Sequence, residues 1–142
     1  AAAERVRAAG LDDVETTGDD EELWMRQRVR QRVEAPEDTC AVKVSGRIGD
    51  LPAAVRAAAD AGGSLVGRAG LGLFWLTVPA EAVPAVREAL APRACTVLDA
   101  PAALREDAWP APEEGALAVM ARVKERFDPA RIFRPGSFVG GI

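Results

Sequence analysis

Histidine is absent from this sequence, which removes the commonest general base and metal ligand of proteins. The chain itself therefore holds no Ser-His-Asp or Cys-His catalytic arrangement and no zinc site with histidine ligands. Cysteine is also scarce, because Cys40 and Cys95 are the only two, and two thiolates do not make a four-cysteine zinc site. We expect both cysteines to be reduced thiols, as in cytoplasmic proteins.

Large aromatic side chains are few, with four Phe, three Trp and no Tyr. No run of about 18 apolar residues occurs, so the sequence predicts no membrane span. A net charge of −4 argues against a nucleic-acid surface, which requires a basic face. These numbers favour a cytoplasmic globular protein that has neither a nucleic-acid partner nor a membrane span.

The length of 142 residues fits one domain, 1–142, with enough chain for a core. The chain starts at Ala1, in what reads as the middle of a helix, so we expect a piece of a larger protein. Residues 1–35 read as a helical lead-in, with helices at about 1–9 and 20–34 separated by an acidic segment. Residues 100–115 are rich in proline and read as a connector, which Trp109 is expected to pin to the body.

A regular alternation of elements occupies residues 40–99 and predicts an α+β fold. The expected order is strand, helix, strand, strand, helix, strand, with strands at 40–45, 64–68, 73–78 and 94–99 and helices at 51–61 and 80–91. This βαββαβ order is that of a ferredoxin-like antiparallel sheet. Right-handed crossovers place the first and third strands in the centre.

Two consequences follow from this predicted sheet. Cys40 and Cys95 start antiparallel neighbouring strands, so they lie about 12 Å or more apart, beyond disulfide reach. The two crossover helices cover one face of the sheet, and the other face needs a cover. The N-terminal helices and the helix at 116–127 are the candidates for that cover.

The C-terminal segment 116–142 reads as a helix followed by an extended tail. Leu117, Met120, Val123 and Phe127 form an apolar arc along the helix. The helix stops before Pro129, because proline disfavours helical geometry in the residue that precedes it. The tail is too apolar for a free end, so we expect it to lie against another surface.

Four basic residues are candidate anion contacts. Arg68 precedes a glycine-rich turn, which lies between two strands and is explained by hairpin geometry at Gly70 and Gly72. Lys124 falls on the apolar arc, where it either pairs with Asp128 four residues later or meets a phosphate or a partner's acid. Arg131 and Arg134 in the tail are either surface side chains or a carboxylate or phosphate site.

A family resemblance begins at Val123, where the chain reads V-K-x-x-F-D-P-x-x-I-F-x-P-G-x-F-V-G-G. This pattern resembles the C-terminal signature of FAD-linked oxidases of the vanillyl-alcohol-oxidase type, which include glycolate oxidase and D-lactate dehydrogenase. Upstream, AGGSLVGRAGLGLFWL at 61–76 and VLDAPAALRE at 97–106 look most like the non-catalytic FAD-binding subunit of bacterial glycolate oxidase.

The resemblance implies a two-domain flavoprotein in which this chain is the C-terminal cap domain. The FAD would be held mainly by an N-terminal domain that this sequence does not contain, and the tail would dock on that domain as a strap at 127–141. The implied cofactor contacts are Arg134, Pro135 and Gly136, with Lys124 and Arg68 as further candidates. The implied partners are the N-terminal FAD domain, other glycolate oxidase subunits and a small 2-hydroxy acid substrate.

Two departures from the family pattern bear on these contacts. Arg134 stands where the family signature has the asparagine that approaches the flavin. Catalytic members carry a histidine in the segment that matches 67–72, where this chain has Arg68 and Leu71 instead. The second departure fits the resemblance to the non-catalytic subunit of glycolate oxidase rather than to its catalytic one.

The expected function is that of a cap domain in an FAD-dependent oxidoreductase that oxidises a 2-hydroxy acid, with no catalytic residue in this chain and no turnover by the isolated chain. The alternative is a stand-alone ferredoxin-like domain that binds a small molecule or another protein. We also expect residues 130–142 to be more mobile than the sheet.

Overall fold

The computed structural model describes residues 2–10, 18–34 and 37–142. The centre of the molecule is a four-stranded antiparallel sheet made of β1 (Thr39–Ser45), β2 (Ser64–Arg68), β3 (Leu73–Pro79) and β4 (Ala94–Asp99). The strand order is β2-β3-β1-β4, so β1 and β3 are central, as the sequence predicts. In register, Val42 lies opposite Leu76 of β3 and Val97 of β4.

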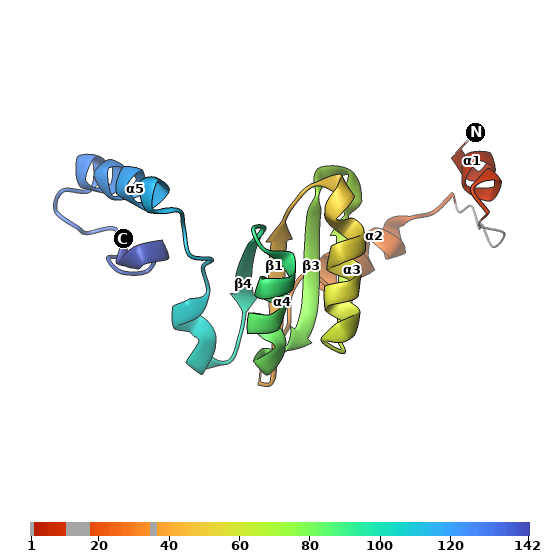
Figure 1. Cartoon of the computed structure of the whole chain (residues 1–142), viewed down its shortest axis with the longest axis horizontal. Coiled ribbons are helices and arrows are strands. Elements are labelled where there is room, and N and C mark those ends of the chain that lie inside the picture. The colour runs from red at the N-terminus through yellow and green to blue at the C-terminus, as the bar shows by residue number, and fades with distance from the viewer. Residues whose placement is uncertain (1, 11–17, 35–36) are drawn as a thin grey trace.

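Two helices connect the strands and pack on the same face of the sheet (Figure 1). They are α3 (Leu51–Asp60), between β1 and β2, and α4 (Val83–Leu90), between β3 and β4. The predicted helix at 80–91 is divided, because residues 80–82 form a separate 3₁₀ turn and Pro84 lies in the first turn of α4. Proline suits that place, where its missing N–H leaves no hydrogen bond unmade.

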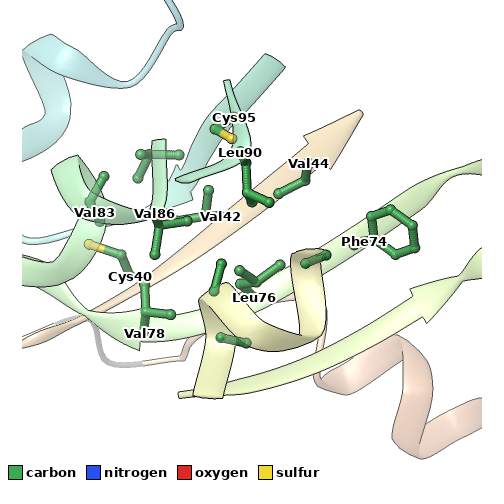
Figure 2. Packing of buried hydrophobic residues seen from close by; sticks show 14 of the residues in the cluster. Cys40, Val42, Val44, Phe74, Leu76, Val78, Val83, Val86, Leu90 and Cys95 are labelled. Carbon is green, nitrogen blue, oxygen red and sulfur yellow. The ribbon is translucent and has the colours of Figure 1, made fainter. Parts of the chain in front are cut away.

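The core lies between the sheet and these two helices (Figure 2). Alternate residues of each strand point into it, as period-two side-chain geometry requires. Helix α3 contributes only small side chains to this layer, Ala54, Ala57 and Ala58, whereas α4 contributes Val83, Val86 and Leu90. The strands supply the remaining bulk, with Cys40, Val42, Val44, Phe74, Leu76, Val78, Cys95 and Val97.

The two cysteines are both buried free thiols. Cys95 lies opposite Val44, and Cys40 is four residues before Val44 on β1, so the two cysteines are not paired across the strands. The prediction that they do not form a disulfide is therefore confirmed. Burial raises the pKa of both thiols, because the charged thiolate is disfavoured away from water.

The second face of the sheet is covered unevenly. Trp75 points to this face and is only 8% exposed, whereas Leu98 is exposed. Helix α2 (Glu21–Val29) runs behind the sheet, and the segment after it is fixed to β4 by Arg32, whose Nε donates to Asp99 Oδ2 at 2.7 Å. Helix α2 is shorter than the predicted 20–34 and buries none of its residues, so Met25 and Val29 are exposed.

The remaining elements lie outside the sheet (Figure 1). Helix α1 (Ala2–Ala8) is at one end of the molecule, and α5 (Glu114–Phe127) with the C-terminal tail is at the other. The connector begins with a 3₁₀ segment, Ala102–Asp107. It is joined to β4 by one hydrogen bond, in which the backbone N–H of Val97 donates to the carbonyl of Ala108 at 2.8 Å. The prediction that the helix at 116–127 could cover the second face of the sheet is therefore wrong, because α5 lies outside the sheet.

The turn between β2 and β3 needs one unusual glycine rather than two. Gly72 has φ = 65°, and a Cβ built on it would lie 2.3 Å from the carbonyl oxygen of Gly46. Gly70 has an ordinary φ and open space around it. The expectation of a hairpin turn that needs positive φ is thus confirmed at Gly72 and wrong at Gly70, because the chain turns through a short 3₁₀ segment at 69–71.

Candidate functional site

Helix α5 and the tail form a separate unit whose geometry is set by the helix end. The helix stops at Phe127, and Asp128 takes a non-helical conformation with φ = −135° before Pro129. The backbone N–H of Asp128 still donates to the carbonyl of Lys124 at 2.7 Å, which closes the last turn. The sequence prediction that proline ends this helix is confirmed.

The Asp128 carboxylate then folds the tail back on the helix. It accepts hydrogen bonds from the backbone N–H of Ile132 at 2.9 Å and of Phe133 at 3.1 Å, and it forms an ion pair with Lys124 Nζ at 2.6 Å. Lys124 Nζ also donates to the carbonyl oxygen of Phe133 at 2.6 Å. We call this arrangement of Lys124, Asp128 and the 132–133 backbone the Asp128 clasp.

The clasp supplies the partners that a carboxylate needs when it is removed from water. Asp128 is 4% exposed and is the buried charged residue of the described chain. The ammonium of Lys124, and then the two backbone N–H groups, hold the pKa of Asp128 below its usual range, although desolvation opposes them. The predicted pairing of Lys124 with Asp128 is confirmed, whereas the backbone contacts of Asp128 were not predicted.

Further contacts continue the folding of the tail, which is turned rather than extended as predicted. Arg131 and Arg134 have positive φ values of 52° and 39°, and Ser137 Oγ donates to the carbonyl of Arg134 at 2.8 Å. Phe138 meets Trp109 of the connector edge-on, with ring centroids 4.7 Å apart. Trp109 therefore contacts the tail, whereas the sequence predicted that it would pin the connector to the body.

Between α5 and the tail lies an apolar groove of about 540 Å³, which we call the strap groove. Most of its lining is hydrophobic and solvent-exposed; Phe127 is 79% exposed and Phe133 is 65% exposed. Its lining includes Val119, Met120, Val123, Phe127, Phe133, Arg134, Phe138 and Ile142. Apolar surface of this extent typically marks a place where another molecule binds.

The structure places the predicted contact residues in two regions. Arg134 lines the strap groove, and Pro135 and Gly136 follow it on the exposed turn. Lys124 is at the same site, but its ammonium is engaged by Asp128 and by the carbonyl of Phe133. Arg68 is not brought to this site, because it ends the edge strand β2, whereas the tail lies beyond the opposite edge (Figure 1).

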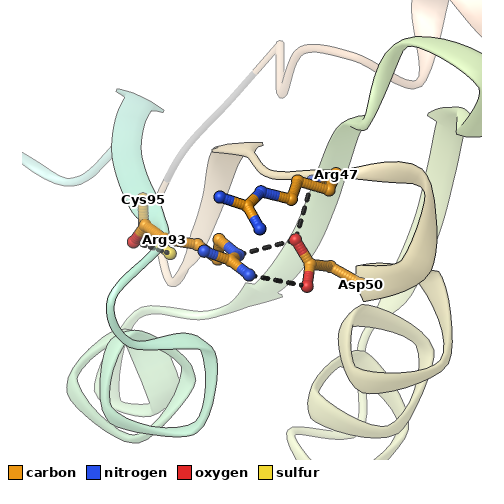
Figure 3. A network of polar contacts seen from close by, with 4 residues as sticks. All are labelled: Arg47, Asp50, Arg93 and Cys95. Atoms are coloured by element: carbon orange, nitrogen blue, oxygen red, sulfur yellow. Dashed lines mark hydrogen bonds and ion pairs between the residues drawn. The ribbon is translucent and has the colours of Figure 1, made fainter.

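A second polar cluster lies at the end of the sheet where β1 ends and β4 begins (Figure 3). Asp50 directly precedes α3, and its side chain makes no capping hydrogen bond to that helix. Its carboxylate instead accepts from Arg93 Nε at 2.6 Å, from Arg93 Nη2 at 3.0 Å and from the backbone N–H of Arg47 at 2.7 Å. Sequence reasoning missed Arg93, because its partner is 43 residues away.

Known proteins offer no guide to either cluster, since no family model, curated protein or solved structure matches the chain. Within the described ranges, no helix is both long and apolar enough to span a membrane. Those ranges also hold no group of three or more Cys, Asp or Glu side chains placed to bind a metal ion.

Proposed function

We propose that the chain is the C-terminal cap domain of a cytoplasmic FAD-linked oxidoreductase of the glycolate oxidase type, acting on a 2-hydroxy acid. The observation that carries the proposal is the strap groove, an apolar surface that the described chain leaves uncovered. The tail is held in one conformation by a partly buried ion pair and two backbone hydrogen bonds, so its shape is set before a partner binds. Such preorganisation reduces the ordering cost of binding.

The fold supports the same proposal at the level of architecture. The order β1-α3-β2-β3-α4-β4, with β1 and β3 central, is consistent with the ferredoxin-like class that the resemblance implies. The strap at 127–141 projects from one end of this body, beyond β4 (Figure 1). We therefore place the N-terminal FAD domain, which this sequence does not contain, against the strap groove.

The predicted contact residues at the strap groove divide into two roles in this proposal. Arg134, with Pro135 and Gly136, presents an exposed guanidinium that fits a phosphate or an electron-rich edge of the FAD. Lys124 fits a positioning role, because its ammonium is held by Asp128 and Phe133 rather than open to a cofactor. When bound, FAD would supply the hydride-accepting chemistry, and this chain would supply orientation and shelter from water.

The test uses the complete natural gene product alongside the isolated chain 1–142. We expect the complete product to carry bound flavin and to oxidise glycolate, and the isolated chain to do neither. In the complete product, Phe133→Ala should weaken the contact between the strap groove and the FAD domain, and flavin should be released faster. Val55→Ala, on the exposed side of α3, should leave the rate of flavin release unchanged. A complete product without flavin, or an isolated chain that turns over glycolate, would contradict the proposal.

The strap groove also favours one second candidate, a protein-interaction domain without a cofactor. In that case the complete gene product would bind a partner protein through Phe127 and Phe133 and would contain no flavin. The flavin content of the complete product separates the two candidates.

A further inference from the structure

Three loops meet at the end of the sheet where β1 ends and β3 and β4 begin. Ser45 is paired with Leu73 of β3 and with Ala94 of β4, so Arg47 and Arg93 leave the sheet side by side. Figure 3 shows their guanidinium groups next to one another. Arg68 ends β2 at the same end of the sheet, opposite Leu73.

Within the described part of the chain, the hydrogen bonds of Arg93 use one edge of its guanidinium and leave the other edge without a partner. A guanidinium carries five N–H donors. Asp50 takes Nε at 2.6 Å and one donor of Nη2 at 3.0 Å, which is the side edge of the group. The end edge, formed by Nη1 and the second donor of Nη2, is a fork that matches the two oxygens of a carboxylate or phosphate.

Asp50 holds this fork in place. The ion pair is half-sheltered, with side-chain exposures of 28% for Arg93 and 21% for Asp50. The same carboxylate accepts the backbone N–H of Arg47 at 2.7 Å, which ties the loop after β1 to the ion pair. Beneath it, the backbone N–H of Gly46 donates to the carbonyl of Gly72 at 2.8 Å, so the loop is also fixed to the turn before β3.

The charges of the cluster do not balance. Among the described residues, Asp50 forms its ion pair with Arg93 and not with the side chain of Arg47, so two neighbouring guanidinium groups have one carboxylate beside them. Arg68 adds positive charge at the same end of the sheet. Two cations held side by side repel each other, and an anion placed between them would remove that repulsion.

We propose that Arg47 and Arg93 form a binding site for a small oxyanion, a carboxylate or a phosphate group, at this end of the sheet. Arg93 supplies the preoriented fork, Arg47 supplies a second cation beside it, and Asp50 is the positioning residue. The site goes beyond the proposed function, because it lies on the sheet body and shares no residue with the strap groove.

The experiment is a titration of the isotope-labelled chain 1–142, followed by the NMR signals of the Arg47 and Arg93 side-chain N–H groups and of the 46–50 backbone. Inorganic phosphate and acetate are added separately at constant ionic strength, with chloride as the balancing ion. We expect saturable shifts of these signals with phosphate, acetate or both, and the stronger probe identifies the preferred oxyanion. Arg47→Gln should lower the affinity about tenfold or more, the factor for one charge-assisted hydrogen bond.

Two further variants separate a site from general attraction to positive charge. Arg122→Gln, on α5 and far from the cluster, makes the same change in net charge and should leave the affinity unchanged. Arg93→Lys keeps the charge but removes the fork, and it should weaken binding as Arg47→Gln does. The proposal is overturned if neither anion gives saturable shifts, or if Arg122→Gln lowers the affinity as much as Arg47→Gln. Neither result would bear on flavin binding by the complete gene product.

Discussion

Single carboxylates organise both polar clusters of this molecule. Asp128 gathers the tail onto α5, and Asp50 gathers two loops at the end of the sheet. Each accepts at least one backbone N–H in addition to a cationic side chain, which makes the contact charge-assisted and directional. The consequences of losing either carboxylate should therefore be local and specific.

Replacing Asp128 by Asn tests the clasp. We expect Asp128→Asn to lower the hydrogen-exchange protection of the Ile132 and Phe133 amides about tenfold or more, because the charge that attracts Lys124 and these N–H groups is lost. Asp60→Asn, at the exposed end of α3, makes the same charge change and should have no such effect. Unchanged protection in Asp128→Asn would show that the tail is held by its apolar contacts alone.

Acid should open the clasp in a predictable direction. The pKa of Asp128 is lower in the folded chain than its ordinary value, so its stabilising contribution is present above about pH 4 and is lost as the pH falls through the folded pKa. We expect the amide chemical shifts of Ile132 and Phe133 to move toward random-coil values in that range. In Asp128→Asn this acid transition should be absent; a transition that persists there would assign it to other groups.

The close crossing of Gly46 and Gly72 gives a second test at a single residue. Gly72→Ala should destabilise the sheet by at least about 2 kcal/mol, because alanine is strained at positive φ and its Cβ would meet the Gly46 carbonyl. Gly70→Ala, in the same turn but with open space and an ordinary φ, should stay within about 0.5 kcal/mol of the parent. Urea unfolding followed by the fluorescence of buried Trp75 measures the free energy of unfolding of both variants. Equal losses in the two variants would contradict the close approach of Gly72 to Gly46.

At the scale of elements, the four strands and the two helices of the body are predicted well from periodicity. Strand alternation and the glycine and proline positions fix β2 and β4 to the residue, 64–68 and 94–99. Periodicity also identifies the apolar arc of α5. It does not say what that arc meets, and the structure leaves Val123 and Phe127 of the arc exposed.

The same limit explains what was missed in the two polar clusters. The pair Lys124–Asp128 is four residues apart on one helix, so spacing alone predicts it. The pair Asp50–Arg93 depends on which strands are neighbours and on the path of two loops, so nothing local in the sequence indicates it. Contacts within an element are thus predictable, and contacts between loops require the fold.

The exposed arc of α5 leads to a prediction about stability. Phe127→Ala should leave the free energy of unfolding of the isolated chain within about 0.5 kcal/mol, because a side chain that is already 79% exposed loses little on truncation. The same substitution at Phe74, which is fully buried in β3, should cost about 3–5 kcal/mol. Urea unfolding curves of the two variants provide the comparison, and a large loss in Phe127→Ala would mean that α5 packs on the body in solution.

At the scale of the whole molecule, the chain consists of a packed body and a C-terminal unit joined by a thin connector (Figure 1). The last described tie to the sheet is the hydrogen bond from Val97 to Ala108, and from Trp109 onward the aromatic contact is with the tail. Helix α5 buries none of its own residues. Regions that bury little apolar surface open at low free energy.

The two units should therefore unfold separately. We expect the amide signals of α5 and the tail to disappear at lower urea concentration than those of β1 and β3, because the sheet core holds nearly all the buried hydrophobic residues. A glutamate-specific protease should cut first at the exposed Glu113 and leave a body that keeps its sheet spectrum. If the proposed FAD domain docks on the strap groove, it should protect this bond, because binding stabilises the ordered state. Coincident unfolding of α5 and the sheet in the isolated chain would instead mean that the two units form one cooperative domain.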